Sequence, residues 1–166
     1  MVGRVVSQAE RREASSPAVE PLLLATDLLV RIGEDLARAY PDEGCGVLLG
    51  RVRMDRREVI RAVPAENVWD GRSDRYQIDP EILRELLTAE GDEDDLRVLG
   101  FYHSHPDADP EPSSTDRELA WPWYFYVIWP VREGVAGVPR AWRLAENRFV
   151  EIELQIGQAD LAGRQP

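Results

Sequence analysis

The chain has two histidines, His103 and His105, which stand one residue apart at the end of an apolar run, Val98 to Tyr102. Such a run has the composition of a buried β-strand, and residues i and i+2 of a strand point to the same face. Both imidazole rings can therefore reach one ion, and neutral imidazole is the commonest nitrogen ligand of zinc. We interpret the pair as two ligands of a metal site; the alternative is a pair of histidines at a solvated strand end.

A catalytic zinc site has three protein ligands and leaves its fourth position to water. Asp116, eleven residues beyond His105, is our candidate for the third ligand, because the proline-rich loop 106–112 can double back. The acidic side chains of that loop compete for the same role, and they are Asp107, Asp109 and Glu111. The prolines keep the loop extended, which favours solvated acids, but spacing alone leaves the choice open.

Ser113 and Asp116 have the S-x-x-D spacing of a capping box, the hydrogen-bonded start of a helix. This structural interpretation is compatible with a role in the site. If a helix begins where the histidine strand ends, its first turn can hold Asp116 against the metal and present the Ser113 hydroxyl beside it.

A hydrolase also needs a base for the attacking water. Glu43 is the best-placed candidate, because it lies between an amphipathic segment and the apolar run Gly46 to Leu49. In so acidic a chain, spacing alone makes any single glutamate a weak indication.

Hydrophobic periodicity predicts the elements that must position these residues. Apolar side chains recur at steps of three and four over residues 27–40, which is typical of an amphipathic helix, and Pro41 ends it. Further helices are predicted over 80–87 and 113–119, and strands over 46–52, 58–63, 76–78, 97–105, 125–131, 140–144 and 149–154. This alternation predicts an α/β architecture around one mixed sheet.

The domain is expected to span residues 21–158, between a flexible tail at 1–20 and a second tail at 159–166. An acidic stretch, residues 90–95, is predicted to form a solvated loop. Because 166 residues can bury a sufficient core unaided, a metal in this chain would serve chemistry rather than stability.

Composition excludes several classes of function. With 31 acidic against 20 basic residues, the net charge is −11, the wrong sign for binding nucleic acid or an anionic membrane. The longest apolar run, residues 121–131, contains two prolines and is well short of the roughly 20 residues that span a bilayer. A single cysteine, Cys45, and the absence of an apolar secretory core in residues 1–13 predict a cytoplasmic location.

Two segments resemble one known family. His103-Ser104-His105-Pro106, followed after six residues by Ser113 and Asp116, resembles the H-x-H-P-x6-S-x-x-D signature of the JAMM (MPN+) zinc metalloproteases. The segment Glu43-Gly44-Cys45-Gly46 resembles the one that holds the family's catalytic glutamate. Residues 76–80, 100–102 and 141–143 are similar to the compact prokaryotic members, so the resemblance covers roughly residues 22–154.

The resemblance implies a single MPN domain with a mixed central sheet flanked by helices, a layout similar to that of cytidine deaminases. It implies that His103, His105 and Asp116 bind Zn²⁺, that Glu43 is the general base and that Ser113 helps to hold the oxyanion. It also implies that Cys45 is structural and does not bind metal.

The family hydrolyses an amide or isopeptide bond after the C-terminal tail of a ubiquitin-like or sulfur-carrier protein of the β-grasp type. Such a tail would lie extended along a sheet edge. Only about 40 residues follow Asp116 within the expected domain, which leaves little room for the insertions of larger relatives. We therefore favour a processing peptidase for a sulfur carrier over a broader enzyme that removes protein tags; the oligomeric state is left open.

Functions of other classes make different demands on the sequence. A non-catalytic MPN scaffold that only assembles complexes would be expected to lack one or more of the ligands, and none is missing here. A zinc nucleoside deaminase needs a P-C-x-x-C pair that one cysteine cannot supply. The H-E-x-x-H motif of another protease class is absent.

Overall fold

The computed structural model of the protein describes residues 20–68, 76–88 and 96–157. Within these residues the chain forms three helices, α1 (Thr26–Ala39), α2 (Pro80–Thr88) and α3 (Ser114–Leu119). Nine strands accompany them: β1 (Leu22–Ala25), β2 (Cys45–Val52), β3 (Arg57–Ala65), β4 (Arg97–Pro106), β5 (Phe125–Arg132), β6 (Val135–Ala136), β7 (Arg140–Ala145), β8 (Arg148–Ile152) and β9 (Leu154–Gly157). None of the described helices is long and apolar enough to cross a membrane.

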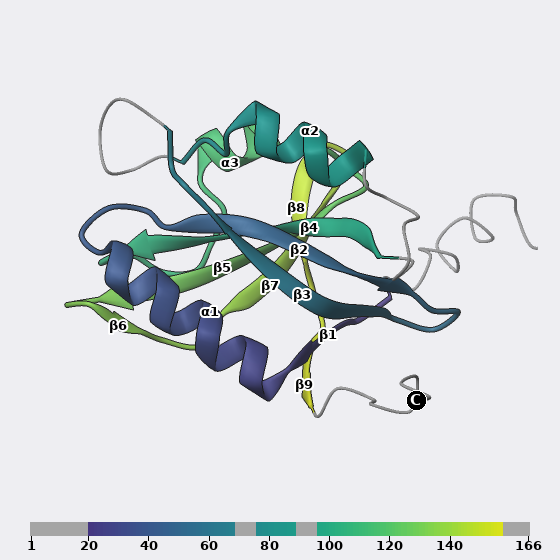
Figure 1. Ribbon diagram of the computed structural model, residues 1–166, viewed down its shortest axis with the longest axis horizontal. Coiled ribbons are helices and arrows are strands. Elements are labelled where there is room, and N and C mark those ends of the chain that lie inside the picture. Colours follow the sequence, from purple (N-terminus) through teal and green to yellow (C-terminus); the bar gives the residue numbers. More distant parts are fainter. Residues whose placement is uncertain (1–19, 69–75, 89–95, 158–166) are drawn as a thin grey trace, which may run out of the picture.

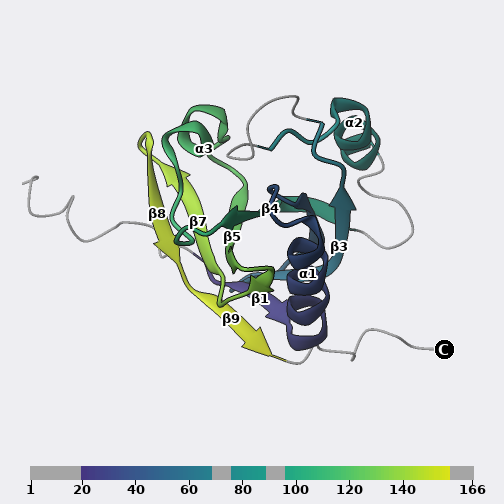
Figure 2. The same ribbon diagram turned by 90° about the vertical axis from the view of Figure 1, so that its left-hand side faces the viewer.

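All nine strands belong to one mixed sheet, in the order β8-β7-β5-β4-β2-β3-β1-β9, with β6 paired to β5. β4 and β5 run parallel, as β1 does with β3 and β9, and the other pairs are antiparallel. The sheet curls strongly (Figures 1 and 2). Its two edge strands, β8 and β9, are separated along the chain by a single residue, Glu153, so the sheet forms a nearly closed barrel.

The helices cover opposite faces of this sheet, α1 on one side and α2 and α3 on the other (Figure 1). Leu28, Ile32 and Leu36 of α1 are buried at helical spacing and pack into the larger core cluster with Tyr102 of β4. Phe101, which immediately precedes Tyr102 in β4, belongs to the second core cluster, under α2 and α3. β4 therefore sends alternate side chains into two different cores.

The predicted domain with a mixed sheet between flanking helices is confirmed. Most predicted elements agree with the structure to within two residues. β1 and β6 were not predicted, and the strand predicted over 149–154 is interrupted at Glu153, because β8 and β9 pair at opposite edges of the sheet. Residues 76–78 are not a strand; they make only an isolated bridge between Ile78 and Asn67.

Three predictions fall on parts of the chain outside the described residues. They are the N-terminal tail up to residue 19, the acidic loop 90–95 and the C-terminal tail 159–166. The limits of the domain therefore stay a prediction.

Gly100 fixes the approach of β4 and β5, and its substitution should be costly. A Cβ atom there would lie 2.1 Å from the backbone oxygen of Phe125, which cannot move without shifting β5. We expect Gly100→Ala to lower the free energy of unfolding by about 1–3 kcal/mol, as overpacking does. Gly157→Ala is the control, since its Cβ would meet only Leu23 Cδ1 at 3.6 Å. Denaturant unfolding with equal losses in both variants would contradict this account.

Candidate metal-centred active site

The end of β4 brings the two imidazole rings together. His103 and His105 alternate with Ser104 and project toward the side of the sheet that carries α3, both largely buried. Their Nε2 atoms lie 3.0 Å apart. Nδ1 of His105 lies 2.9 Å from the backbone oxygen of Asp109, which fixes that ring with Nε2 turned toward the site. In the described part of the chain, Nδ1 of His103 has no such partner.

The first turn of α3 delivers Asp116 to the same point. Its Oδ1 lies 3.2 Å from His103 Nε2 and its Oδ2 lies 3.5 Å from His105 Nε2. The capping box is also formed: Ser113 N and Ser113 Oγ donate to Asp116 Oδ2 at 2.7 and 2.6 Å, and Asp116 N donates to Ser113 Oγ at 3.1 Å. The capping box is therefore confirmed, and the same geometry leaves Asp116 Oδ1 facing His103, so the cap is compatible with Asp116 as a candidate ligand.

The acids that competed with Asp116 are bonded elsewhere. Asp107 accepts a hydrogen bond from the Tyr40 hydroxyl at 2.9 Å. Asp109 forms an ion pair with Arg132, and Glu111 forms one with Arg140. The three donor atoms that converge within 4.8 Å of one another come from His103, His105 and Asp116.

Charge states in the site are set by burial and by these contacts. Burial lowers the pKa of His103 below its ordinary value, although the nearby Asp116 carboxylate opposes the shift. Burial alone would raise the pKa of Asp116, but the charge of His103 and hydrogen bonds from His103, His105 and Ser113 hold it well below its usual range. The carboxylate is therefore anionic, as a metal ligand must be.

The pKa of His105 moves the other way. Burial lowers it, but hydrogen bonds to Asp116 and to the Asp109 carbonyl, together with the charges of Asp116 and Glu43, raise it above its ordinary value. A proton on Nε2 and a cation compete for the same lone pair, so metal binding here should release a proton.

This donor set fits a zinc ion. Two imidazole nitrogens and one carboxylate oxygen are the ligand types of catalytic zinc sites with three protein ligands, and the pocket beside Asp116 leaves room for a fourth. Cys45 lies outside the group: burial raises the pKa of its thiol to about 12, and its Sγ contacts the Ala65 carbonyl at 3.7 Å.

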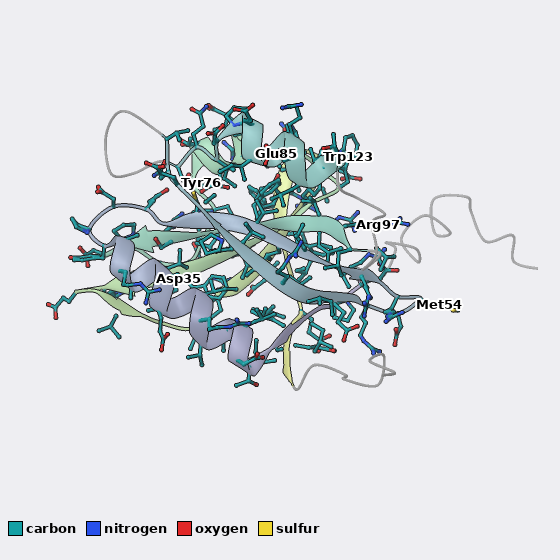
Figure 3. The ribbon with its side chains drawn as sticks, in the orientation of Figure 1. Asp35, Met54, Tyr76, Glu85, Arg97 and Trp123 are labelled. Atoms are coloured by element: carbon teal, nitrogen blue, oxygen red, sulfur yellow. The ribbon has the colours of Figure 1, made fainter. Side chains whose placement is uncertain are left out.

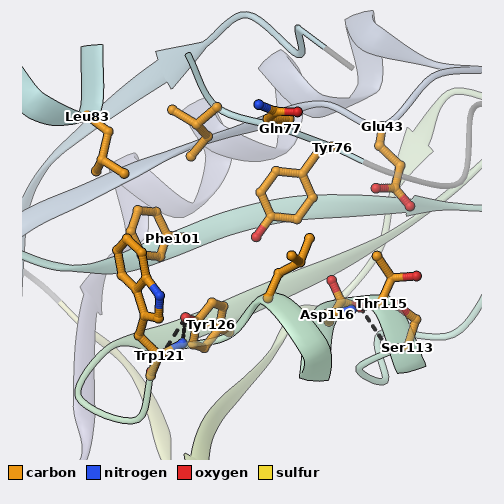
Figure 4. Close-up of a pocket in the computed structure, with 12 residues that line it drawn as sticks. Glu43, Tyr76, Gln77, Leu83, Phe101, Ser113, Thr115, Asp116, Trp121 and Tyr126 are labelled. Carbon is orange, nitrogen blue, oxygen red and sulfur yellow. Dashed lines mark hydrogen bonds between the residues drawn. The ribbon is translucent and has the colours of Figure 1, made fainter. Parts of the chain in front are cut away.

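Glu43 and Asp116 line the same pocket, which Figure 4 shows with the Glu43 carboxylate pointing toward Asp116 and Ser113. Glu43 is buried, at 7% exposure, and follows α1 just before β2. Ser104, between the two histidines, ties this segment to β4: its Oγ accepts from Gly44 N at 2.9 Å, and its N donates to the Gly44 carbonyl at 3.0 Å. The β2–β4 pairing thus sets Glu43 beside the candidate ligands.

Two residues of the site had no assigned role in the sequence. The ring of Tyr76 stacks on His103, with centroids 4.4 Å apart and an interplanar angle of 25°, and it lines the pocket in the centre of Figure 4. Asn67 joins two segments: its Nδ2 donates to the Glu43 carbonyl, and its Oδ1 accepts from Gln77 N, both at 3.0 Å. Asn67 thereby links the candidate base to the segment that carries Tyr76.

This link should affect catalysis. Asn67→Ala removes both hydrogen bonds, and we expect a loss of about 1–3 kcal/mol in stability together with a lower kcat and an unchanged zinc content. Asn67→Asp is the matched variant, because it keeps the acceptor for Gln77 N and loses only the donor to Glu43. Unfolding curves, steady-state rates and metal analysis check this; wild-type kcat in Asn67→Ala would contradict it.

Relatives of known name share most of this chain. A desampylase from Haloferax volcanii is 45% identical over 113 residues, which is 64% of this chain and 78% of that protein. A CysO-cysteine peptidase from Mycobacterium tuberculosis is 31% identical over 136 residues, 81% of this chain and 90% of that one. A probable TtuB-protein conjugate cleaving protease from Thermus thermophilus is 36% identical over 132 residues, 79% and 81% of the two chains.

The fold has a counterpart of known structure. The solution structure of protein DSY2949 from Desulfitobacterium hafniense superposes with a TM-score of 0.71 at 27% identity, over 86% of this chain and 97% of that one. Residues 25–145, which include the helix before Glu43, the histidine strand and Asp116, match the family described as prokaryotic homologs of the JAB domain. The chain belongs to this prokaryotic JAB family.

Proposed function

We propose that this protein is a zinc-dependent peptidase or isopeptidase that hydrolyses the amide bond after the C-terminal tail of a ubiquitin-like or sulfur-carrier protein. The observation that carries the proposal is the convergence of His103, His105 and Asp116 in a pocket that Glu43 also lines. The named relatives support the substrate class, since their names describe a desampylase, a CysO-cysteine peptidase and a protease that cleaves TtuB-protein conjugates.

In this proposal each side chain has one task. His103, His105 and Asp116 would hold a zinc ion, which would supply Lewis acidity to the attacking water and to the scissile carbonyl. Glu43 accepts the proton of the attacking water and passes it to the departing amine. The Ser113 hydroxyl turns from Asp116 to donate to the oxyanion.

The aromatic wall of the pocket suits this chemistry. Tyr76 holds the His103 ring by stacking, and Phe101 and Tyr126 lie further along the same pocket. Aromatic side chains there exclude water from the substrate, which strengthens the electrostatic contacts of Glu43.

The test is mass spectrometry of carrier adducts incubated with zinc-loaded protein, beside a sample treated with chelator. The adducts are a sulfur carrier extended by a C-terminal cysteine and a ubiquitin-like protein linked to a lysine side chain. Release of free carrier in the zinc sample alone is the expected result. Faster release of cysteine than of the lysine-linked protein would favour the processing role. Intact adducts in both samples, with no zinc retained by the protein, would instead favour a non-catalytic scaffold.

The setting of this activity is proposed with it. A protein substrate in the cytoplasm fits a net charge of −11, which disfavours nucleic acid and anionic membranes, and a single cysteine that is buried. We assign the activity to one domain, residues 21–158.

A further inference from the structure

Beside the active-site pocket lies a group of exposed apolar side chains, Leu119, Trp121 and Trp123, which we call the Trp123 patch. Their exposed fractions are 67%, 46% and 69%. Leu119 and Trp121 line the same pocket as Asp116 and Glu43, and Trp123 is two residues further along the loop that follows α3. The patch is therefore continuous with the place where substrate must bind.

The loop that carries the patch is held in a defined conformation. Trp121 N donates to the Tyr126 hydroxyl at 2.8 Å, and Arg143 Nε donates to the Pro122 carbonyl at 3.2 Å. The Trp121 ring also packs on Tyr124, with centroids 5.8 Å apart. Two indoles are thus presented to solvent from a loop whose backbone is fixed, and a preorganised loop loses less entropy on binding a partner.

We infer that the Trp123 patch docks the folded body of the carrier protein, through an apolar surface of that body next to its C-terminal tail. The inference rests on the proposed function and names a second contact, outside the tail. The scissile carbonyl must reach Asp116 and Glu43, so the substrate runs along a pocket whose other end is bounded by Phe101 and Trp121 (Figure 4). In this inference the tail enters from that end, so the carrier body that precedes it contacts Trp121 and Trp123.

A second copy of this chain is the competing occupant of the patch. It would sit over the mouth of the pocket and obstruct the substrate, because Leu119 and Trp121 belong to the patch and to the pocket lining alike. The carrier body, by contrast, would reach the patch when its own C-terminal tail binds in the pocket. Continuity with the pocket therefore favours the carrier.

The test compares two substrates that differ only in the body. One is a whole carrier extended by a C-terminal cysteine. Its leaving group is a single amino acid, so the carrier is the only protein in the substrate that can contact the patch. The other is a peptide of its last eight or so residues with the same cysteine, roughly 26 Å when extended. For Trp123→Ala we expect the ratio of kcat/KM for the carrier to kcat/KM for the peptide to fall about tenfold or more, mainly through KM, and Trp123→Phe to restore part of it.

Met54→Ala is the control, since Met54 is fully exposed on the β2–β3 turn, does not line the pocket and lies apart from Trp123, below it in Figure 3. Its ratio should stay at the wild-type value. An unchanged carrier-to-peptide ratio of kcat/KM in Trp123→Ala would overturn the docking inference. If sedimentation also showed that the wild type is a dimer and that Trp123→Ala is a monomer, the patch would instead bind a second copy of this chain. Failure of the wild type to cleave either substrate would instead contradict the proposed function. The failure of the docking inference and the failure of the proposed function therefore give different results.

Discussion

Glu43→Gln should retain zinc and lose hydrolysis. The amide has nearly the same shape as the carboxylate that it replaces but cannot accept a proton, and general base catalysis of this kind contributes on the order of 10²–10⁴-fold. We expect kcat to fall by that amount. Because the converging donor group consists of His103, His105 and Asp116, removal of the Glu43 carboxylate should leave the zinc content unchanged.

The measurement is single-turnover release of carrier, with zinc determined by elemental analysis on the same preparations. Asp42→Asn is the matched control: Asp42 is the adjacent acid, it is exposed, and its backbone N keeps its hydrogen bond to the Ala39 carbonyl. It should keep its rate, so that a loss in Glu43→Gln cannot be ascribed to net charge alone. Full activity of purified Glu43→Gln would remove Glu43 from the mechanism.

The histidine pair could be predicted from the sequence because it depends only on local geometry. In a strand, residues 103 and 105 must share a face whatever the rest of the fold does, and in the structure their Nε2 atoms face each other. Asp116 was a choice among nearby acids. The three competing acids each have a partner elsewhere: just after α1 for Asp107, on β5 for Asp109 and on β7 for Glu111. No spacing in the loop shows those partners.

The roles of Asn67 and Tyr76 could not be predicted, since both come from contacts distant along the chain. In the sequence Asn67 is an ordinary polar residue after a strand. Its role comes from the hydrogen bond of its side chain to the carbonyl of Glu43, 24 positions earlier. Tyr76 gains its role from stacking on His103. The segment 76–78 was predicted as a strand, but it pairs only through Ile78 with Asn67.

The closure of the sheet could not be predicted either, because it also depends on pairing between segments distant along the chain. β1 has four residues, and its partners, β3 and β9, begin at residues 57 and 154. A strand this short carries no periodic signal of its own. Residues 149–154 look like one continuous strand in the sequence, yet Leu22 N donates to the carbonyl of Glu153 at 3.0 Å, where the chain passes from β8 to β9.

Asp116→Asn and His103→Ala should each lose both zinc and activity. We expect zinc affinity to fall by more than the 10–100-fold that follows loss of a residue behind a ligand, because a ligand itself is altered. Asp116→Asn is the sharper variant: its amide oxygen can still accept from Ser113 N and Ser113 Oγ, so the start of α3 is preserved. Zinc competition with a chromophoric chelator measures the loss.

Ser113→Ala separates the two roles of the S-x-x-D segment. It removes the hydroxyl that caps α3, at a cost of about 1 kcal/mol, and leaves the Asp116 carboxylate facing His103. Zinc should stay bound while turnover falls on the order of a hundredfold through loss of an oxyanion donor. Glu111→Gln tests the rival ligand, since Glu111 is paired with Arg140 and its loss should leave zinc in place. Wild-type zinc affinity in Asp116→Asn, with loss of zinc in Glu111→Gln, would move the third ligand into the loop and leave Asp116 as a helix cap alone.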